Sequence, residues 1–136
     1  MTSRRSVRWH ITGLALLAIV PVAAGALSVH LRLLRSEPAA NARLAAAPTQ
    51  VKLWFSQRAE LAVTSIKLRS GSGATAVERV LAPLSRASAN DAPITANVGA
   101  ALAPGHFEVV WRTMARDGHV LNGVIPFDVG VTPAQR

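Results

Sequence analysis

The sequence predicts an all-β fold, a sandwich of antiparallel strands, that follows an amino-terminal export signal. Several short segments after Ala47 alternate apolar and polar residues with the two-residue period of a strand. Glycine and proline separate these segments. No segment beyond Ala47 shows the apolar stripe of an amphipathic helix, so two packed layers of strands are the simplest way to bury the alternating faces.

Residues 1–26 have the composition of an export signal. Three arginines precede an apolar run over residues 11–20, and the small residues Ala24-Gly25-Ala26 follow it. This order is typical of a signal peptide, and we expect cleavage after Ala26, which leaves a domain of residues 27–136. The alternative is an uncleaved membrane anchor that extends to about residue 29. Both alternatives place the domain outside the cytoplasmic membrane, in the periplasm or an equivalent compartment.

Composition limits the kinds of site that the domain can carry. There is no cysteine, which excludes disulfides and thiolate metal sites, so a metal site must use His, Asp, Glu, Met or the amino terminus. The formal net charge is +8 for the whole chain, and +5 beyond Ala26, because three basic residues and no acidic ones precede that point. The basic residues are scattered and form no run interleaved with aromatics, so we expect no nucleic-acid partner. We also expect a monomer.

Four segments carry the alternation that predicts a strand with one buried face. They are residues 51–55, 66–69, 106–114 and 125–129. Pro126 lies within the last of them and predicts an edge strand, because proline cannot donate a hydrogen bond to a neighbouring strand. Trp111 lies in the apolar phase and is expected in the core. Trp54 lies in the polar phase, which predicts either partial burial at a sheet edge or an aromatic that contacts a partner.

Asp117-Gly118-His119 sets two potential metal ligands two residues apart. In a strand their side chains would project to the same face. A carboxylate oxygen and an imidazole nitrogen placed together suit an ion such as Cu(II), which favours mixed nitrogen and oxygen ligands. Asp-Gly is also common in tight hairpin turns, and residues 120–129 supply a returning strand. Taken alone, the residues favour the turn.

Four separate stretches together resemble the CopC family of exported copper-resistance proteins. They are His30 with Ser36, Pro38 and Ala39; Pro48 with Val51, Leu53 and Phe55; Pro104-Gly105 with Phe107, Val109 and Trp111; and Asp117-Gly118-His119 with Gly123. They occur in the family's order over nearly the whole domain. The resemblance implies an Ig-like Greek-key β-sandwich that holds Cu(II) outside the cytoplasmic membrane.

The resemblance also implies His30, Asp117 and His119 as the copper ligands. In the family the first histidine is commonly the mature amino terminus, and its amino group and imidazole then form a chelate called a histidine brace. This chain departs from that pattern, because cleavage after Ala26 leaves residues ahead of His30. Arg116 is a second departure, since a cation there either lowers the affinity for a dication or pairs with Asp117 when metal is absent.

Two other side chains are not expected to bind copper. Met114 is the only methionine beyond the start codon, so no methionine-rich Cu(I) site is expected. His106 follows Pro104-Gly105 and is expected to be a solvated turn histidine rather than a fourth ligand.

The function that the resemblance implies is a non-enzymatic carrier or buffer of Cu(II) in copper resistance and homeostasis. Its partners would be the copper ion and a membrane copper transporter or another periplasmic copper protein. One alternative is a metal-free sandwich for interaction or assembly, in which Asp-Gly is only a turn. The other is a brace-type oxidative copper enzyme. The absence of tyrosine and of any recognisable substrate platform counts against the enzyme.

Overall fold

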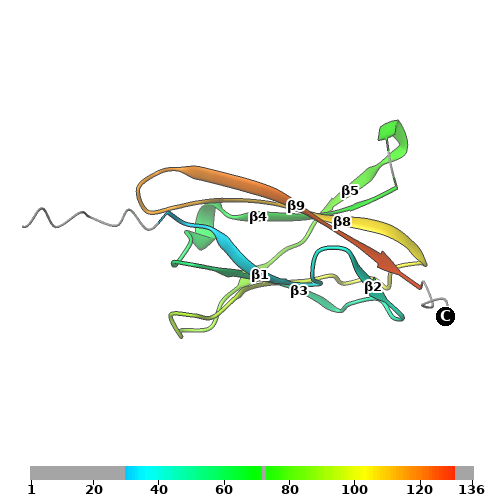
Figure 1. Ribbon diagram of the computed structural model, residues 1–136, viewed down its shortest axis with the longest axis horizontal. Helices are drawn as coiled ribbons and strands as arrows, with labels where there is room; N and C mark the ends of the chain where they lie inside the picture. Colours follow the sequence, from blue (N-terminus) through cyan, green and yellow to red (C-terminus); the bar gives the residue numbers. More distant parts are fainter. Residues whose placement is uncertain (1–29, 72, 131–136) are drawn as a thin grey trace, which may run out of the picture.

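The computed structural model describes residues 30–71 and 73–130. The predicted signal segment, residues 1–26, lies outside the described residues. The described chain forms a four-stranded and a five-stranded sheet that pack face to face (Figure 1). The all-β sandwich prediction is confirmed. Within the described ranges, no helix is long and apolar enough to span a bilayer.

Successive strands change sheets repeatedly along the chain, as in Greek-key sandwiches. The four-stranded sheet has the order β1 (Leu33–Glu37), β3 (Gln50–Phe55), β7 (Ile94–Asn97) and β6 (Leu84–Ser85). The five-stranded sheet has the order β2 (Ala42–Leu44), β9 (Val120–Val129), β8 (Gly105–Met114), β4 (Ser65–Ser70) and β5 (Val77–Val80). Two 3-10 turns, η1 (Leu61–Val63) and η2 (Gly73–Thr75), lie on either side of β4 in the sequence. The paired strands are antiparallel except for β2 and β9, which are parallel.

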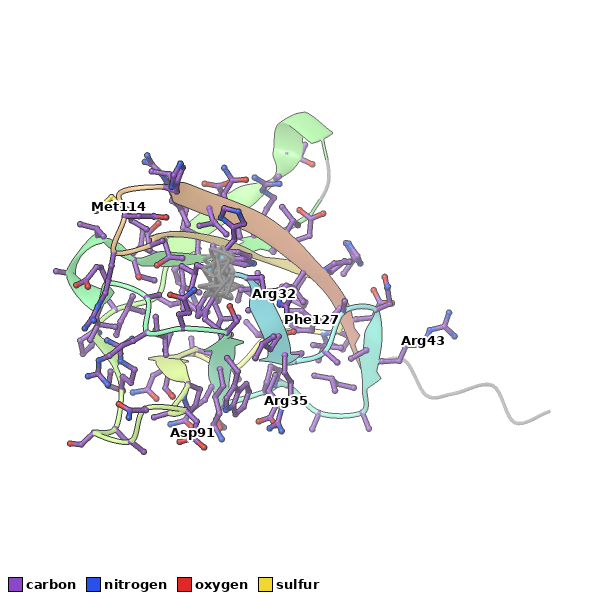
Figure 2. The ribbon with its side chains drawn as sticks, turned by 60° about the vertical axis from the view of Figure 1, so that its left-hand side comes forward. Arg32, Arg35, Arg43, Asp91, Met114 and Phe127 are labelled. Carbon is purple, nitrogen blue, oxygen red and sulfur yellow. The ribbon has the colours of Figure 1, made fainter. Side chains whose placement is uncertain are left out.

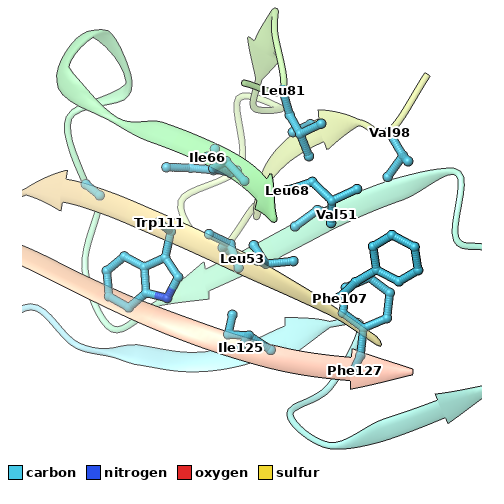
Figure 3. Close-up of a cluster of buried hydrophobic side chains, with 14 of the residues drawn as sticks. Val51, Leu53, Ile66, Leu68, Leu81, Val98, Phe107, Trp111, Ile125 and Phe127 are labelled. Atoms are coloured by element: carbon cyan, nitrogen blue, oxygen red, sulfur yellow. The ribbon is translucent and has the colours of Figure 1, made fainter. Parts of the chain in front are cut away.

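The core fills the space between the inner faces of the two sheets (Figure 3). Val51 and Leu53 of β3 are fully buried, as their phase predicted. Phe107 and Phe127 are cross-strand neighbours on β8 and β9, and their rings stack with 5.7 Å between centroids. Burying one such side chain contributes about 1.5–3 kcal/mol, so this layer dominates the stabilisation of the sandwich.

Trp111 of β8 packs in the core next to β9, the strand that follows the hairpin turn. Its side chain is buried, as expected, and the ring of Phe55 meets it edge-on with 5.3 Å between centroids. Gly123 lies directly opposite Trp111 in the register of β8 and β9. A Cβ atom at Gly123 would lie 2.7 Å from the indole ring, so only glycine leaves room for this tryptophan.

Trp54 is half-buried, but the predicted cause was wrong. Its strand, β3, lies between β1 and β7 and is not at a sheet edge. The Arg35 guanidinium covers the Trp54 ring instead, 3.9 Å from its centroid. The partial burial therefore comes from a cation stacked on the outer face of the sheet.

Pro126 does not mark an edge strand, since β9 lies between β2 and β8. The carbonyl of Pro126 accepts a hydrogen bond of 2.7 Å from the backbone N–H of Asn41, on the side facing away from β8. The N–H and C=O of a strand residue point to the same side. Proline at this position therefore removes no donor from the β8–β9 ladder, which explains why it is tolerated inside the sheet.

Candidate metal centre

Residues 115–119 form the turn that joins β8 to β9. The Ala115 N–H donates to the His119 carbonyl at 2.9 Å, and the Gly118 N–H donates to the Ala115 carbonyl at 3.0 Å. Gly118 has a φ of +86°, in the left-handed region that favours glycine. This is a short hairpin loop with glycine at its left-handed position. The turn interpretation of Asp117-Gly118 is confirmed, and the alternative of a continuous strand is wrong.

The turn brings the side chains of Asp117 and His119 into contact. Oδ1 of Asp117 accepts a hydrogen bond of 3.1 Å from the His119 backbone N–H. Oδ2 of the same carboxylate lies 3.0 Å from Nδ1 of the His119 ring. The two side chains are 56% and 76% exposed, respectively, so an ion from solvent reaches both without any rearrangement of the core.

These contacts keep the carboxylate ionised. The His119 backbone N–H, and after it the His119 side chain, lower the pKa of the Asp117 carboxyl. Both interactions favour the charged form of the acid. A carboxylate that remains charged at neutral pH is in the state that binds a metal cation.

The pKa of Asp117 gives a direct test of this arrangement. We expect carboxyl-carbon NMR to show a titration midpoint below that of an ordinary aspartate. The stabilisation linked to this group is present above the unfolded-state pKa and is lost as the pH falls through the lower folded-state pKa. In His119→Ala the midpoint should rise only part of the way, because the backbone N–H, the larger cause, remains. A return to the ordinary value would contradict the role of the backbone hydrogen bond.

Arg116 does not pair with Asp117, contrary to one of the two effects expected of it. Its Nε atom lies 3.8 Å from Oε1 of Glu60. The Glu60 backbone N–H donates to the Met114 carbonyl at 3.2 Å, which attaches the segment before η1 to the end of β8. No local pattern in the sequence indicates that Glu60 lies at this end of the sandwich, because the contact joins segments that are far apart in the chain.

His30 is the first described residue, and its imidazole is exposed. Its carbonyl accepts a hydrogen bond of 3.2 Å from the Ser56 hydroxyl, and that hydroxyl accepts one of 3.1 Å from the Arg32 N–H. These bonds attach the start of the described chain to the end of β3, at the same end of the sandwich as the β8–β9 turn (Figure 1).

The structure brings together two of the three predicted ligands. In the part of the chain that it describes, no group of three or more His, Asp and Glu side chains is close enough to hold one ion. Asp117 and His119 are in contact, and His30 does not complete a cluster with them. The participation of His30 stays a prediction.

A second histidine–carboxylate pair lies at the other end of the same hairpin. His106 stands opposite Asp128 in the register of β8 and β9, and its Nδ1 atom lies 2.8 Å from Asp128 Oδ1. The expected solvated turn histidine is therefore a half-exposed strand residue with a carboxylate neighbour. Most of the length of β8 separates it from the turn, roughly 25–30 Å at the rise of a strand, so it cannot share an ion with His119.

The Asp117–His119 pair fits a first-row metal ion. Ligands with bonds of about 2 Å to one ion lie roughly 3 Å from each other, which matches the contact between the carboxylate and the imidazole. Mixed nitrogen and oxygen donors suit Cu(II) better than they suit Cu(I), which prefers sulfur. The fold and the site thus define a two-sheet β-sandwich with an exposed carboxylate–imidazole pair on a hairpin turn.

Residues 33–130 match the CopC domain, and the chain belongs to the CopC domain family. Over 124 residues it is 29% identical to the copper transport protein CutJ of Bacillus subtilis (strain 168). The aligned residues make up 90% of this chain and 22% of CutJ. The chain thus spans about a fifth of the length of that relative. It is also 27% identical over 128 residues to the protein YobA of Escherichia coli (strain K12), covering 94% of this chain and 98% of YobA.

The fold is similar to that of CopC from Methylosinus trichosporium OB3b. The crystal structure of that protein superimposes with a TM-score of 0.62 and 28% sequence identity, over 74% of this chain and 93% of that chain. The family and the sandwich fold that the resemblance implied are both confirmed.

Proposed function

We propose that this protein is an exported, non-enzymatic Cu(II)-binding protein that carries or buffers copper in copper resistance and homeostasis. The observation that carries the proposal is the contact between the Asp117 carboxylate and the His119 imidazole on an exposed turn. Membership of the CopC domain family and the similarity to a copper transport protein support copper as the metal. In this proposal the ion is cargo, and no bond in a substrate is made or broken.

The ligand set that we propose is His119, Asp117 and His30. An ion held between Nδ1 of His119 and Oδ2 of Asp117, which lie 3.0 Å apart, would replace the contact between these two atoms. The carboxylate then contributes the oxygen donor of the pair, and the imidazole contributes the nitrogen donor. His30 begins at the same end of the sandwich and would add a third donor.

The location and the partners that we propose rest on membership of the CopC domain family. We infer that residues 1–26 direct export and that the domain acts as a monomer outside the cytoplasmic membrane. Its partner would be a membrane copper transporter or another periplasmic copper protein. The match to part of the longer copper transport protein CutJ supports a partner of this kind.

The function is tested by Cu(II) titration of the exported protein, followed by electron paramagnetic resonance spectroscopy. We expect a single saturable centre with nitrogen coupling, because imidazole binds the ion. The mass of the exported chain would show whether cleavage follows Ala26. Weak binding that does not saturate would overturn the proposal and favour the metal-free sandwich.

A further inference from the structure

The first half of β9 is open on the side that faces away from β8. On that side β2 pairs only with Phe127–Val129, through Ala42–Leu44. Within the described ranges, the strand that Figure 2 shows beside this part of β9 is β1, which begins directly after Arg32, contains Arg35 and pairs with β3 rather than with β9. The five-stranded sheet therefore has a free edge that begins directly after the Asp117–His119 turn.

Hydrogen bonds at the two ends of β9 show which residues face this edge. The Ala115 N–H donates to the His119 carbonyl, so residue 119 faces β8. The Pro126 carbonyl accepts from Asn41, so residue 126 faces the opposite side. Backbone direction alternates along a strand, and both observations agree that the even-numbered residues of β9 point away from β8.

Val120, Asn122 and Val124 therefore present three N–H donors and three carbonyl acceptors at the free edge. Within the described ranges these backbone groups have no hydrogen-bond partner. Natural proteins usually protect such an edge with lysine, proline, a bulge or a covering segment. Among the residues that the structure describes, none of these lies on the stretch from Val120 to Val124, so it is ready to pair with another strand.

A groove runs beside this edge, between β9 and β1. It has a volume of about 450 Å³, and its lining includes Leu34, Ala39, Val124 and Ile125. Leu34 is 60% exposed and Val124 is 50% exposed, so the groove has an apolar lining that solvent reaches. A strand added to β9 would direct every second side chain towards this groove, which suits aliphatic residues at alternate positions.

Two arginines flank the groove and the edge. Arg32 directly precedes the groove residues of β1, and Arg112 stands opposite Asn122 on the outer face of the sheet. Both are exposed, and neither has an ion-pair partner in the described part of the chain. By contrast, Arg69 on the same outer face pairs with both Glu78 and Glu108. The charge at the β9 edge would repel a second copy of this chain and attract carboxylates.

We propose that the free edge of β9 binds an extended acidic segment of a partner protein as an additional strand. The backbone groups of Val120, Asn122 and Val124 supply the hydrogen bonds, and the groove beside Leu34 takes the apolar side chains. Arg32 and Arg112 select acidic residues at the remaining positions. The interaction does not depend on copper, although it would place the partner beside the copper-binding turn.

The test uses a fluorescein-labelled, end-blocked seven-residue peptide in which valine alternates with glutamate, with the protein kept metal-free by a chelator. We expect saturable binding by fluorescence anisotropy, with the largest amide NMR changes at Val120, Asn122 and Val124. Asn122→Pro should weaken binding about tenfold or more, because it removes an edge donor and blocks close approach. It should still fold, because residue 122 has the same strand phase as Pro126.

The matched control is Val80→Pro on β5, the opposite edge of the same sheet. The Leu81 N–H donates to the Ile66 carbonyl, so the neighbouring Val80 points away from β4, and proline there also spares the ladder. This variant should bind the peptide as the native protein does. Should Asn122→Pro fail to fold by circular dichroism, Arg32→Glu combined with Arg112→Glu must abolish binding of the acidic peptide.

Three results would overturn the proposal. The first is equal affinity of the native protein and Asn122→Pro. The second is equal binding of a peptide in which lysine replaces glutamate. The third is a dimer in sedimentation that Asn122→Pro dissociates, which would make a second copy the occupant. All three are measured without copper, so they are independent of the outcome of the copper titration.

Discussion

Replacement of His119 by alanine is expected to weaken Cu(II) binding by about 100-fold or more, and to remove ring-nitrogen coupling from the electron paramagnetic resonance spectrum. Loss of a group that only orients a ligand costs 10–100-fold in typical metal sites, so loss of the ligand itself should reach or exceed that range. Because the ring is exposed, its removal should leave the fold unchanged, and circular dichroism would verify this.

Asp117→Ala should have a smaller effect, about tenfold, because water can replace a carboxylate oxygen whereas nothing nearby replaces the imidazole. His106→Ala is the matched control, since it removes a histidine beside a carboxylate at the far end of the hairpin. It should leave the high-affinity centre unchanged. Equal affinities for His119→Ala and Asp117→Ala would contradict the ranking, and a loss in His106→Ala would place the copper at the other end of the sandwich.

Trp111→Ala is expected to lower the free energy of unfolding by about 3–5 kcal/mol, as for other large aromatic side chains removed from a core. The substitution leaves a cavity between the ring of Phe55 and Gly123, and neither group can fill it without moving a strand. Trp54→Ala is the control, since it removes an aromatic that only stacks with Arg35 on the outer face. Its cost should be about 1 kcal/mol or less.

Urea unfolding followed by far-ultraviolet circular dichroism measures both tryptophan variants. Gly123→Ala adds an independent test of the same packing, because its new Cβ would overlap the indole of Trp111. It should destabilise the protein by about 1–3 kcal/mol. Similar stabilities for Trp111→Ala and Trp54→Ala would show that the indole of Trp111 does not hold the two sheets together.

The longer strands of the sandwich were predictable because their pattern is local. Val51 to Phe55 and Phe107 to Trp111 alternate between an inner and an outer face, and the hairpin return at Val120 follows from the Asp-Gly turn. β5 could not be found this way, because all four of its residues are exposed and no alternation results. The pairing of β2 with β9 was equally hidden, since it depends on the tertiary arrangement.

The contacts at the candidate site differ in the same way, because some lie within one short segment and others join remote segments. Asp117 and His119 are two residues apart, so the chemistry of one short segment was enough to single them out. The ion pair of Arg116 with Glu60 and the attachment of His30 to Ser56 join remote segments, which no local pattern reports. Pro126 misled the prediction because the direction of its backbone, and not its presence in a strand, decides whether a hydrogen bond is lost.

The position of β9 has a consequence for how the protein acquires its structure. The last strand of the described residues, β9, lies inside the five-stranded sheet, with β2 on one side and β8 on the other. During synthesis β2 emerges early and has no partner until residues 127–129 follow. The sheet therefore completes only after β9 has been made, so β2 stays unpaired, and vulnerable to proteases, for most of the time that the domain takes to emerge.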